Sequence, residues 1–334
     1  MSAALPGRIK EFALDPAQLP LDRSNDWQPL AFIDLAICAQ DAQIPSLPPF
    51  PVIGIGDREH PLAARLDAVI EPPIAAEELI RQVEQCPEAA AVTIQLLRAL
   101  EGMTLEHALT VESFAYGMLQ AGREHSAWLV KSRVAGTPEA ASGRVRVARA
   151  NDELFVVIER PAARNAMNRE ISDQLFEAFT LAATDASIKA VKFRAIGPAF
   201  CAGADLTEFG TTLDPAMAHL IRARTLPAWP LAACGRVVDV HVHGPCVGAG
   251  VEMAAFAARV TAVPEAWFQL PELAMGLLPG AGGCVSVSRR IGRQRAALIM
   301  LSGQRIDAES ALRWGLIDAI EHEPPIDQRG AHEV

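Results

Sequence analysis

The stretch GPCVGAGVEMA (244–254) has the pattern of a strand, a Gly/Ala turn and the start of a helix. The first turn of this predicted helix carries Glu252. A helix N-terminus has free N–H groups and the positive end of the helix dipole, here near Ala249. The stretch therefore predicts backbone donors and a carboxyl group close together.

Two further stretches complete a candidate site. GPAFCAGADL (197–206) follows a predicted strand, and its small residues at 201–204 let the backbone approach a ligand closely. FQLPELAMGLLPGAGG (268–283) places Glu272 after a proline in a loop. Two N–H donors can form an oxyanion hole around a carbonyl oxygen, and two carboxyls can divide general acid and base work. No sequence motif of a nucleophile accompanies them.

The second half of the chain alternates between strands and helices, which predicts an α/β architecture. Apolar runs predict strands at 153–159, 190–196, 236–242, 259–263 and 316–320. Apolar residues at helical spacing, together with capping residues, predict helices at 169–184, 249–258, 282–291 and 293–301, and a short helix between Asp307 and Gly315.

The first half differs in character. Short apolar runs predict strands at 30–37, 50–56 and 66–71. Helix formers follow, with predicted helices at 76–86, 87–101, 104–121 and 123–133. AGTPEAASG (135–143) is rich in small residues and predicts a linker.

Composition narrows the function classes. The chain has 334 residues and a formal net charge of −10, which disfavours binding of nucleic acid. No uncharged apolar run is long enough to predict a membrane span. Six scattered cysteines without a CxxC pair predict reduced thiols and a cytoplasmic protein, and the absence of a ligand cluster predicts no bound metal. Four arginines are expected on a solvated face: Arg289, Arg290, Arg293 and Arg295.

Residues 144–322 resemble the crotonase family, most closely its enoyl-CoA hydratases. The resemblance rests on ERPAARNAMN (159–168), AFCAGADL (199–206), VHGPCVGAGVEMA (242–254), FQLPELAMGLLPGAGG (268–283) and LSGQRIDAESALRWGLID (301–318). It implies a spiral of ββα units, coenzyme A thioester chemistry without a separate cofactor, and a homo-oligomer such as a trimer or hexamer.

The resemblance also implies roles for individual residues. Ala204 and Ala249 match the two oxyanion N–H positions, and Glu252 and Glu272 match the two hydratase glutamates. Trp128 and Lys131 match residues near the adenine and phosphates of CoA, and a packing Trp with a solvated Lys is the alternative. The remaining positions expected to bind substrate are Ala202, Gly203, Asp205, Leu206, Gly248, Ala163 and Asn165.

The order of the segments departs from the family pattern. Residues 86–133 resemble the helices that normally follow the crotonase core, yet here they precede it. LDAVIEPP (66–73) also echoes LIDAIEHEPP (316–325). We therefore expect a permuted chain, and an unrelated helical domain is the alternative. The expected parts are a small α/β segment (1–75) left from a tandem core, a helical lid and oligomerisation region (76–134), the linker (135–143), the core (144–322) and a tail (323–334).

The expected reaction is hydration of a 2-enoyl-CoA thioester to a 3-hydroxyacyl-CoA. An enoyl-CoA isomerase or another crotonase-type lyase or hydrolase is one alternative, and a non-catalytic subunit that binds CoA thioesters is another. The sequence leaves open which glutamate is the acid, and which acyl group is bound.

Overall fold

The computed structural model describes residues 7–19, 28–134 and 142–322. Most of the predicted linker and all of the predicted tail lie outside these ranges. The largest sheet has the strand order β12-β9-β7-β6-β5-β4, and every pair is parallel except β4 with β5. Its strands are β4 (Arg144–Ala150), β5 (Glu153–Glu159), β6 (Ala190–Ala195), β7 (Val238–Val242), β9 (Arg259–Ala262) and β12 (Ala319–Ile320).

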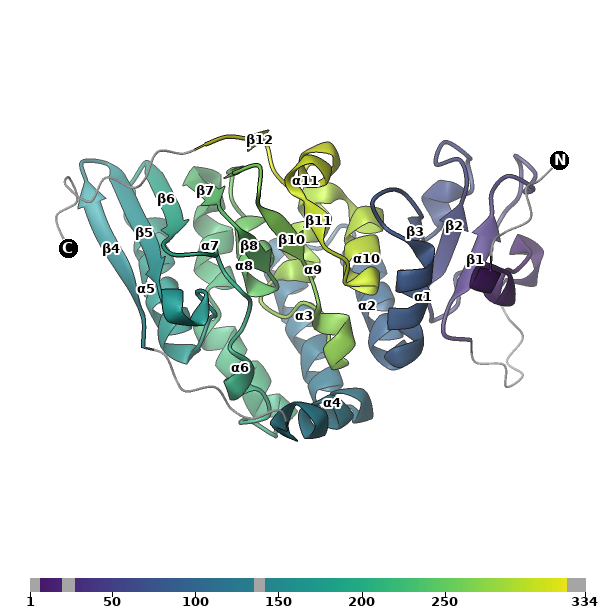
Figure 1. The fold of residues 1–334 in the computed structure, drawn as a ribbon, viewed down its shortest axis with the longest axis horizontal. Helices are drawn as coiled ribbons and strands as arrows, with labels where there is room; N and C mark the ends of the chain where they lie inside the picture. Colours follow the sequence, from purple (N-terminus) through teal and green to yellow (C-terminus); the bar gives the residue numbers. More distant parts are fainter. Residues whose placement is uncertain (1–6, 20–27, 135–141, 323–334) are drawn as a thin grey trace.

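Helices of the core pack beside this sheet (Figure 1). α5 (Arg169–Thr184) begins at Asn168, whose side chain accepts a hydrogen bond from Ile171 N–H, and its apolar stripe is buried against β4 and β5. The prediction for 249–258 was too long, because α8 ends at Ala254. The other core helices are α6 (Pro215–Thr225), α7 (Ala228–Cys234), α9 (Gly283–Ile291), α10 (Arg293–Ser302) and α11 (Ala308–Trp314), with α8 starting at Ala249.

A small second sheet has the order β11-β10-β8. Its strands are β8 (Pro245–Val247), β10 (Trp267–Gln269) and β11 (Ile306–Asp307). None of them was predicted, because strands of two or three residues show no readable alternation. This sheet matters for function because β8 and β10 lead directly into the two predicted glutamate segments.

The N-terminal part forms a third sheet, all parallel, in the order β1-β2-β3. It lies at the end of the molecule opposite β4 (Figure 1). Its strands are β1 (Ala31–Asp34), β2 (Val52–Ile55) and β3 (Ala68–Val69). All three were predicted, with longer bounds.

Four helices connect this third sheet to the core. α1 packs against α10, α3 packs against α6 and α9, and α4 packs against the 3-10 helix η7 (Glu272–Met275). The helical region thus docks on the core of its own chain. Its helices are α1 (Ala76–Gln85), α2 (Pro87–Ala99), α3 (Leu105–Gln120) and α4 (Arg123–Val134).

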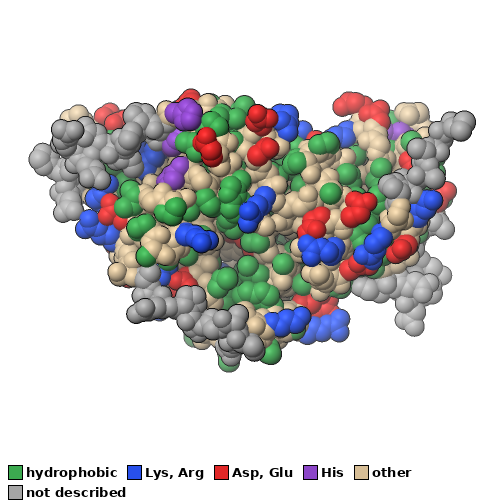
Figure 2. All heavy atoms as spheres, viewed as in Figure 1, with side chains coloured by type: hydrophobic (Ala, Val, Ile, Leu, Met, Phe, Trp, Pro, Cys, Tyr) green, Lys and Arg blue, Asp and Glu red, His purple; other side chains and the backbone are tan. Residues whose placement is uncertain are grey.

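Arg289 is exposed, whereas Arg290, Arg293 and Arg295 are half-buried, so the prediction of a solvated face was wrong for these three. Arg293 donates to Glu101 and lies 3.4 Å from Asp67, and Arg295 pairs with Glu71. These side chains join the core to the N-terminal part. Figure 2 shows charged side chains of both signs side by side on the right of this face, where the N-terminal sheet and α1 lie.

The six cysteines are free thiols, and all but Cys38 are buried. Within the described ranges, no helix is both long enough and apolar enough to cross a bilayer.

Candidate active site

Two loop segments that are distant in sequence run side by side through backbone hydrogen bonds. Cys201 N–H donates to Pro245 O at 3.2 Å, and Val247 N–H donates to Cys201 O at 2.9 Å. These bonds align the loop after β6 with β8, which pairs in turn with β10. Ala204 and Ala249 follow at the same end of the paired segments.

The N–H groups of Ala204 and Ala249 donate to no acceptor among residues 7–19, 28–134 and 142–322. Ala249 is the first residue of α8, where an N–H has no intrahelical acceptor. Ala204 forms a bridge with Met167 in which its neighbours take both bonds: Met167 N–H donates to Gly203 O, and Asp205 N–H donates to Met167 O. Both residues line one cavity, where the two donors are available to a carbonyl oxygen.

Gly248 brings the second oxyanion segment against the glutamates. Its φ of +49° is a conformation that side chains rarely adopt. A Cβ at this position would lie 2.6 Å from Oε1 of Glu272. Any larger residue would therefore displace the Glu272 carboxyl from the oxyanion donor that follows it.

Glu252 is held on α8 with its carboxyl directed at the loop before α9. Its Oε2 accepts hydrogen bonds from Ala281 N–H at 2.6 Å and from Gly283 N–H at 2.8 Å. Burial raises the pKa of Glu252 to about 7, and the two N–H donors partly oppose that rise. Glu252 is therefore a carboxyl that can gain or lose a proton near neutral pH.

Glu272 is the first residue of η7, and its carboxyl lies in a different environment. Its Oε2 is enclosed and has no hydrogen-bond partner among the described residues. Burial, and then the charge of Glu252, raise the pKa of Glu272 well above its usual range. Two interacting carboxyls of this kind titrate as a pair, and Glu272 holds its proton more tightly.

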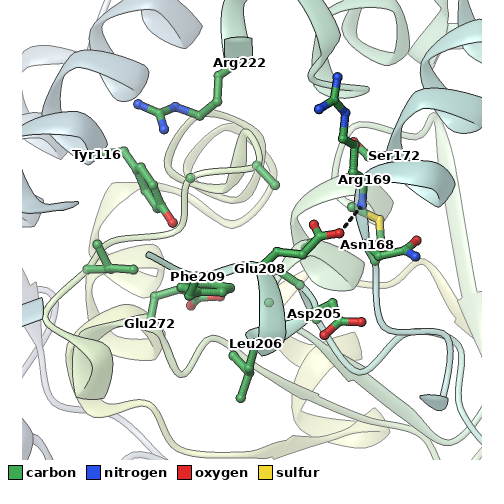
Figure 3. A pocket seen from close by; sticks show the side chains of 18 of the residues that line it. Tyr116, Asn168, Arg169, Ser172, Asp205, Leu206, Glu208, Phe209, Arg222 and Glu272 are labelled. Carbon is green, nitrogen blue, oxygen red and sulfur yellow. Dashed lines mark hydrogen bonds between the residues drawn. The ribbon is translucent and has the colours of Figure 1, made fainter. Parts of the chain in front are cut away.

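Both carboxyls and both N–H donors border a single cavity of about 580 Å³. Figure 3 shows side chains from several elements directed into it. The helical region contributes Tyr116, Gln120 and His125, so the wall is built from both halves of the chain. Five of the residues expected to bind substrate also line it: Ala202, Gly203, Asp205, Leu206 and Gly248.

This geometry agrees with a comparison against known families. Residues 151–328 match the family model described as enoyl-CoA hydratase/isomerase. The chain belongs to the enoyl-CoA hydratase/isomerase family. It is thus an enzyme of the crotonase superfamily, as its sequence motifs predicted.

Individual members of the family are similar over about half of this chain. The 2,3-dehydroadipyl-CoA hydratase of Escherichia coli (strain K12) is 35% identical over 175 residues, which cover 52% of this chain and 68% of the relative. The mevalonyl-coenzyme A hydratase SIDH of Beauveria bassiana is 33% identical, over 50% of this chain and 62% of its own length. This chain therefore spans about two thirds of these relatives.

A solved structure shares the fold. The crystal structure described as an enoyl-CoA hydratase/isomerase from Mycobacterium abscessus has a TM-score of 0.50 and 33% identity, and it covers 54% of this chain and 71% of that one. The mixed α/β architecture predicted from the sequence is that of the family.

Four of the residues expected to bind substrate do not line the cavity of this chain. Asn165 is fully buried, and its amide donates to Ile196 O and Ala199 O, so it fixes the loop around the site. Ala163 belongs to the 3-10 helix η4 (Pro161–Ala163). Trp128 stacks behind His125 with ring centroids 5.5 Å apart, and Lys131 is exposed further along α4.

Three polar residues at the site were not predicted as functional. Glu112 is 1% exposed on α3, and its carboxyl accepts from Gly282 N–H at 2.8 Å and Val285 N–H at 3.2 Å. Tyr116 and Arg222 line the cavity. The available signal was weak: Glu112 and Tyr116 share the apolar stripe of α3, where a carboxyl is unusual.

The described residues contain no group of three or more His, Cys, Asp or Glu side chains that could hold a metal ion. His241 on β7 and His243 just after it, the two histidines of an HxH sequence, bond to Thr261 Oγ1 and Gly197 O.

Proposed function

We propose that this enzyme adds water to a 2-enoyl-CoA thioester and forms a 3-hydroxyacyl-CoA. One observation carries the proposal: two buried carboxyls with raised pKa values and two unpaired N–H groups border one cavity. Among the curated relatives, several are named as hydratases of CoA thioesters.

The N–H groups of Ala204 and Ala249 bind the thioester oxygen as it becomes an enolate. Donors placed at a developing oxyanion contribute about 3–4 kcal/mol each in comparable enzymes. CoA is part of the substrate, so the reaction needs no separate cofactor.

The different environments of the two glutamates support one assignment of roles. Glu252 has the lower pKa because two N–H groups stabilise its charge, and its Oε1 has no hydrogen-bond partner among the described residues. It takes a proton from water, whose oxygen bonds to the β-carbon. Glu272 keeps its proton at neutral pH and delivers it to the α-carbon. One water is consumed, and transfer of a proton from Glu252 to Glu272 restores the starting state of the pair.

Amide variants test this assignment. We expect Glu252→Gln and Glu272→Gln each to lower kcat for hydration about 10²–10⁴-fold, the usual contribution of proton transfer, with little change in binding of a saturated acyl-CoA. In Glu252→Gln the loop before α9 keeps its anchor, because the new amide oxygen still accepts from the N–H groups of Ala281 and Gly283. Glu309→Gln is the matched control, because the Glu309 side chain is 81% exposed.

Products are scored by mass across a panel of 2-enoyl-CoA esters. A product heavier by one water supports hydration. A product isomer without added water would identify isomerisation as the activity instead. Binding of saturated acyl-CoA without turnover of any enoyl-CoA would identify a non-catalytic subunit.

A further inference from the structure

Arg222 is a cation in the cavity wall without an acidic partner. It comes from α6, and its guanidinium donates from Nε to Ser113 Oγ at 3.0 Å, from Nη2 to Ser113 O at 3.1 Å, and from Nη1 to Gln120 Oε1 at 3.2 Å. All three acceptors are neutral. No carboxylate of residues 7–19, 28–134 or 142–322 lies within ion-pair distance of it.

The carboxyl that acts electrostatically on Arg222, after the Tyr116 phenol, is already engaged. This carboxyl is that of Glu112, and both of its oxygens accept backbone N–H groups at the start of α9. Burial lowers the pKa of Arg222, so the surroundings do not favour its charge. Holding a partly desolvated cation without an anion costs free energy. A ligand anion would offset that cost.

Tyr116 places a second donor beside this cation. The Arg222 guanidinium carbon lies 4.7 Å from the centre of the Tyr116 ring. The ring packs on Gly280, where a Cβ would come within 2.1 Å of it. Figure 3 shows the Tyr116 hydroxyl directed into the cavity, and Arg222 above the ring.

The Tyr116 hydroxyl has no hydrogen-bond partner among the described residues. Burial raises the pKa of this phenol, the charge of Arg222 partly opposes that rise, and the charges of Glu252 and Glu272 add to it. The hydroxyl therefore stays protonated and can donate a hydrogen bond. In Figure 3 the Tyr116 side chain lies between Arg222 and Glu272.

We propose that the acyl group of the substrate carries a second carboxylate, which is bound by the Arg222 guanidinium and the Tyr116 hydroxyl. The substrate class is then an enoyl-CoA whose acyl chain ends in an acid rather than a methyl group. This proposal rests on the proposed hydratase function. Arg222 and Tyr116 are specificity residues in it, and they take no part in the proton transfers.

The kinetic test uses two series of 2-enoyl-CoA esters with four to eight acyl carbons, one ending in methyl and one in carboxylate. We expect kcat/KM of the wild type to favour the carboxylate ester at least tenfold at one length or more. Arg222→Gln should remove at least tenfold of that preference, mainly through KM, while values for the methyl esters change less than threefold. Tyr116→Phe should remove a smaller part of the preference for the carboxylate ester, and Arg222→Lys should retain a part of that preference.

Arg224→Gln is the matched control on the same helix, since Arg224 is exposed and lines no part of the cavity. Its preference should equal that of the wild type. Equal values for the two series in the wild type would overturn the proposal. An equal loss for both series in Arg222→Gln would also overturn it, because that result marks a structural role only.

A binding test separates this proposal from the proposed function. Saturated acyl-CoA pairs, ending in carboxylate or methyl, are titrated by calorimetry whether or not enoyl esters turn over. Because the chain has one tyrosine, ring-labelled Tyr116 gives one NMR signal. We expect tighter binding of the carboxylate member and a shift of that signal that Arg222→Gln removes. Equal affinities of the two saturated esters would refute carboxylate recognition even if hydration is confirmed.

Discussion

The two glutamates of the site differ because their oxygens meet different neighbours. Two backbone N–H groups reach Glu252, whereas the enclosed Oε2 of Glu272 has no partner in the described chain. Desolvation acts on both carboxyls, and hydrogen bonding relieves it mainly in one. A local difference of this kind separates an acid from a base without any difference in residue type.

The raised pKa of Glu252 has a consequence for stability. In the unfolded chain the carboxyl loses its proton near its usual pKa of 4.5, whereas in the folded protein it does so at about 7. Between these values the folded state binds more protons, so the free energy of unfolding falls as pH rises, by at most about 1.4 kcal/mol per pH unit. The contribution is complete below pH 4.5 and is lost as pH passes 7.

We therefore expect Glu252→Gln to lose less stability than the wild type between about pH 5 and pH 7. Removing the Glu252 charge also lowers the pKa of Glu272, which adds to the effect. Urea denaturation at three pH values across that window measures the difference, with exposed Glu309→Gln as control. Parallel pH profiles for Glu252→Gln and the wild type would contradict the assignment.

At the scale of elements, α3 and α9 meet through a buried carboxyl. Both oxygens of Glu112 accept N–H groups at the start of α9, while Glu252 accepts from the same loop. Burial, and then the charge of Glu252, raise the pKa of Glu112 well above its usual range, and the N–H groups of α9 partly oppose that rise. α3 thus positions the loop that supplies the hydrogen bonds of Glu252.

Glu112→Gln should disturb this arrangement. One amide oxygen can still accept, but the NH₂ group then faces a backbone donor, which costs about 1–3 kcal/mol. We expect lower stability in urea and a lower kcat, with little change for exposed Glu106→Gln on the same helix. A Glu112→Gln variant with the stability and kcat of the wild type would show that the contact has no such role.

The sequence similarity between 66–73 and 316–325 is accompanied by a similarity in structure. Asp67 Oδ2 accepts from Val52 N–H at 2.8 Å, and Asp318 Oδ2 accepts from Val260 N–H at 2.7 Å. In each case the aspartate precedes a short edge strand, β3 or β12, that pairs in parallel with the strand of the valine that donates to it. This likeness supports the prediction that the first part is left from a tandem core.

The two aspartates differ in burial, which predicts unequal effects. The Asp67 side chain is 0% exposed and forms a two-bond pair with Arg98, whereas that of Asp318 is 44% exposed beside Arg290. We expect Asp67→Asn to lower the free energy of unfolding by about 3–5 kcal/mol and Asp318→Asn by about 1 kcal/mol. Similar losses in the two variants would argue against this account.

Sequence patterns predicted the elements that are long enough to show a period. α3 and α5 lie where helices were predicted, and their N-caps are Thr104 and Asn168. The predicted strand at 236–242 begins instead with the 3-10 helix η6 (Gly235–Val237), and α6 and α7 were not placed. α6 lacks a clear apolar stripe because it lines the cavity and buries only Ala218, and α7 has seven residues, too few to show a period, packed against α5.

The candidate site was predictable where it lies in compact motifs. Glu252, Glu272 and both alanines come from stretches in which neighbouring residues reach one cavity. Glu112, Tyr116 and Arg222 were missed because their partners lie a hundred or more residues away. A contact across such a distance leaves no local spacing to read.

At the scale of the whole molecule, the cavity is shared between the parts before and after the linker. His125 bonds to Met275 O at 2.8 Å, Tyr116 packs on Gly280, and Arg293 reaches Asp67. These contacts are non-covalent and largely buried. The predicted homo-oligomer remains a prediction beside this intrachain assembly.

A chain with a protease site inserted between 135 and 141 tests how firmly the parts are joined. We expect the cleaved halves to co-elute in gel filtration and to keep more than half of the activity, because buried contacts rather than the linker hold them. An uncleaved sample of the same variant is the control. Separation of the halves with loss of turnover would show that covalent connection is required.

The order of the parts along the chain also determines when each part leaves the ribosome. Glu112 leaves the ribosome 170 residues before its partner Gly282. At about 5–20 residues per second, the interval is roughly 10–30 s. During that time the nascent chain presents the apolar stripe of α3 without the core that will cover it. Exposure of this stripe during the interval is the stage at which the chain is most open to aggregation, because the finished contacts do not yet exist.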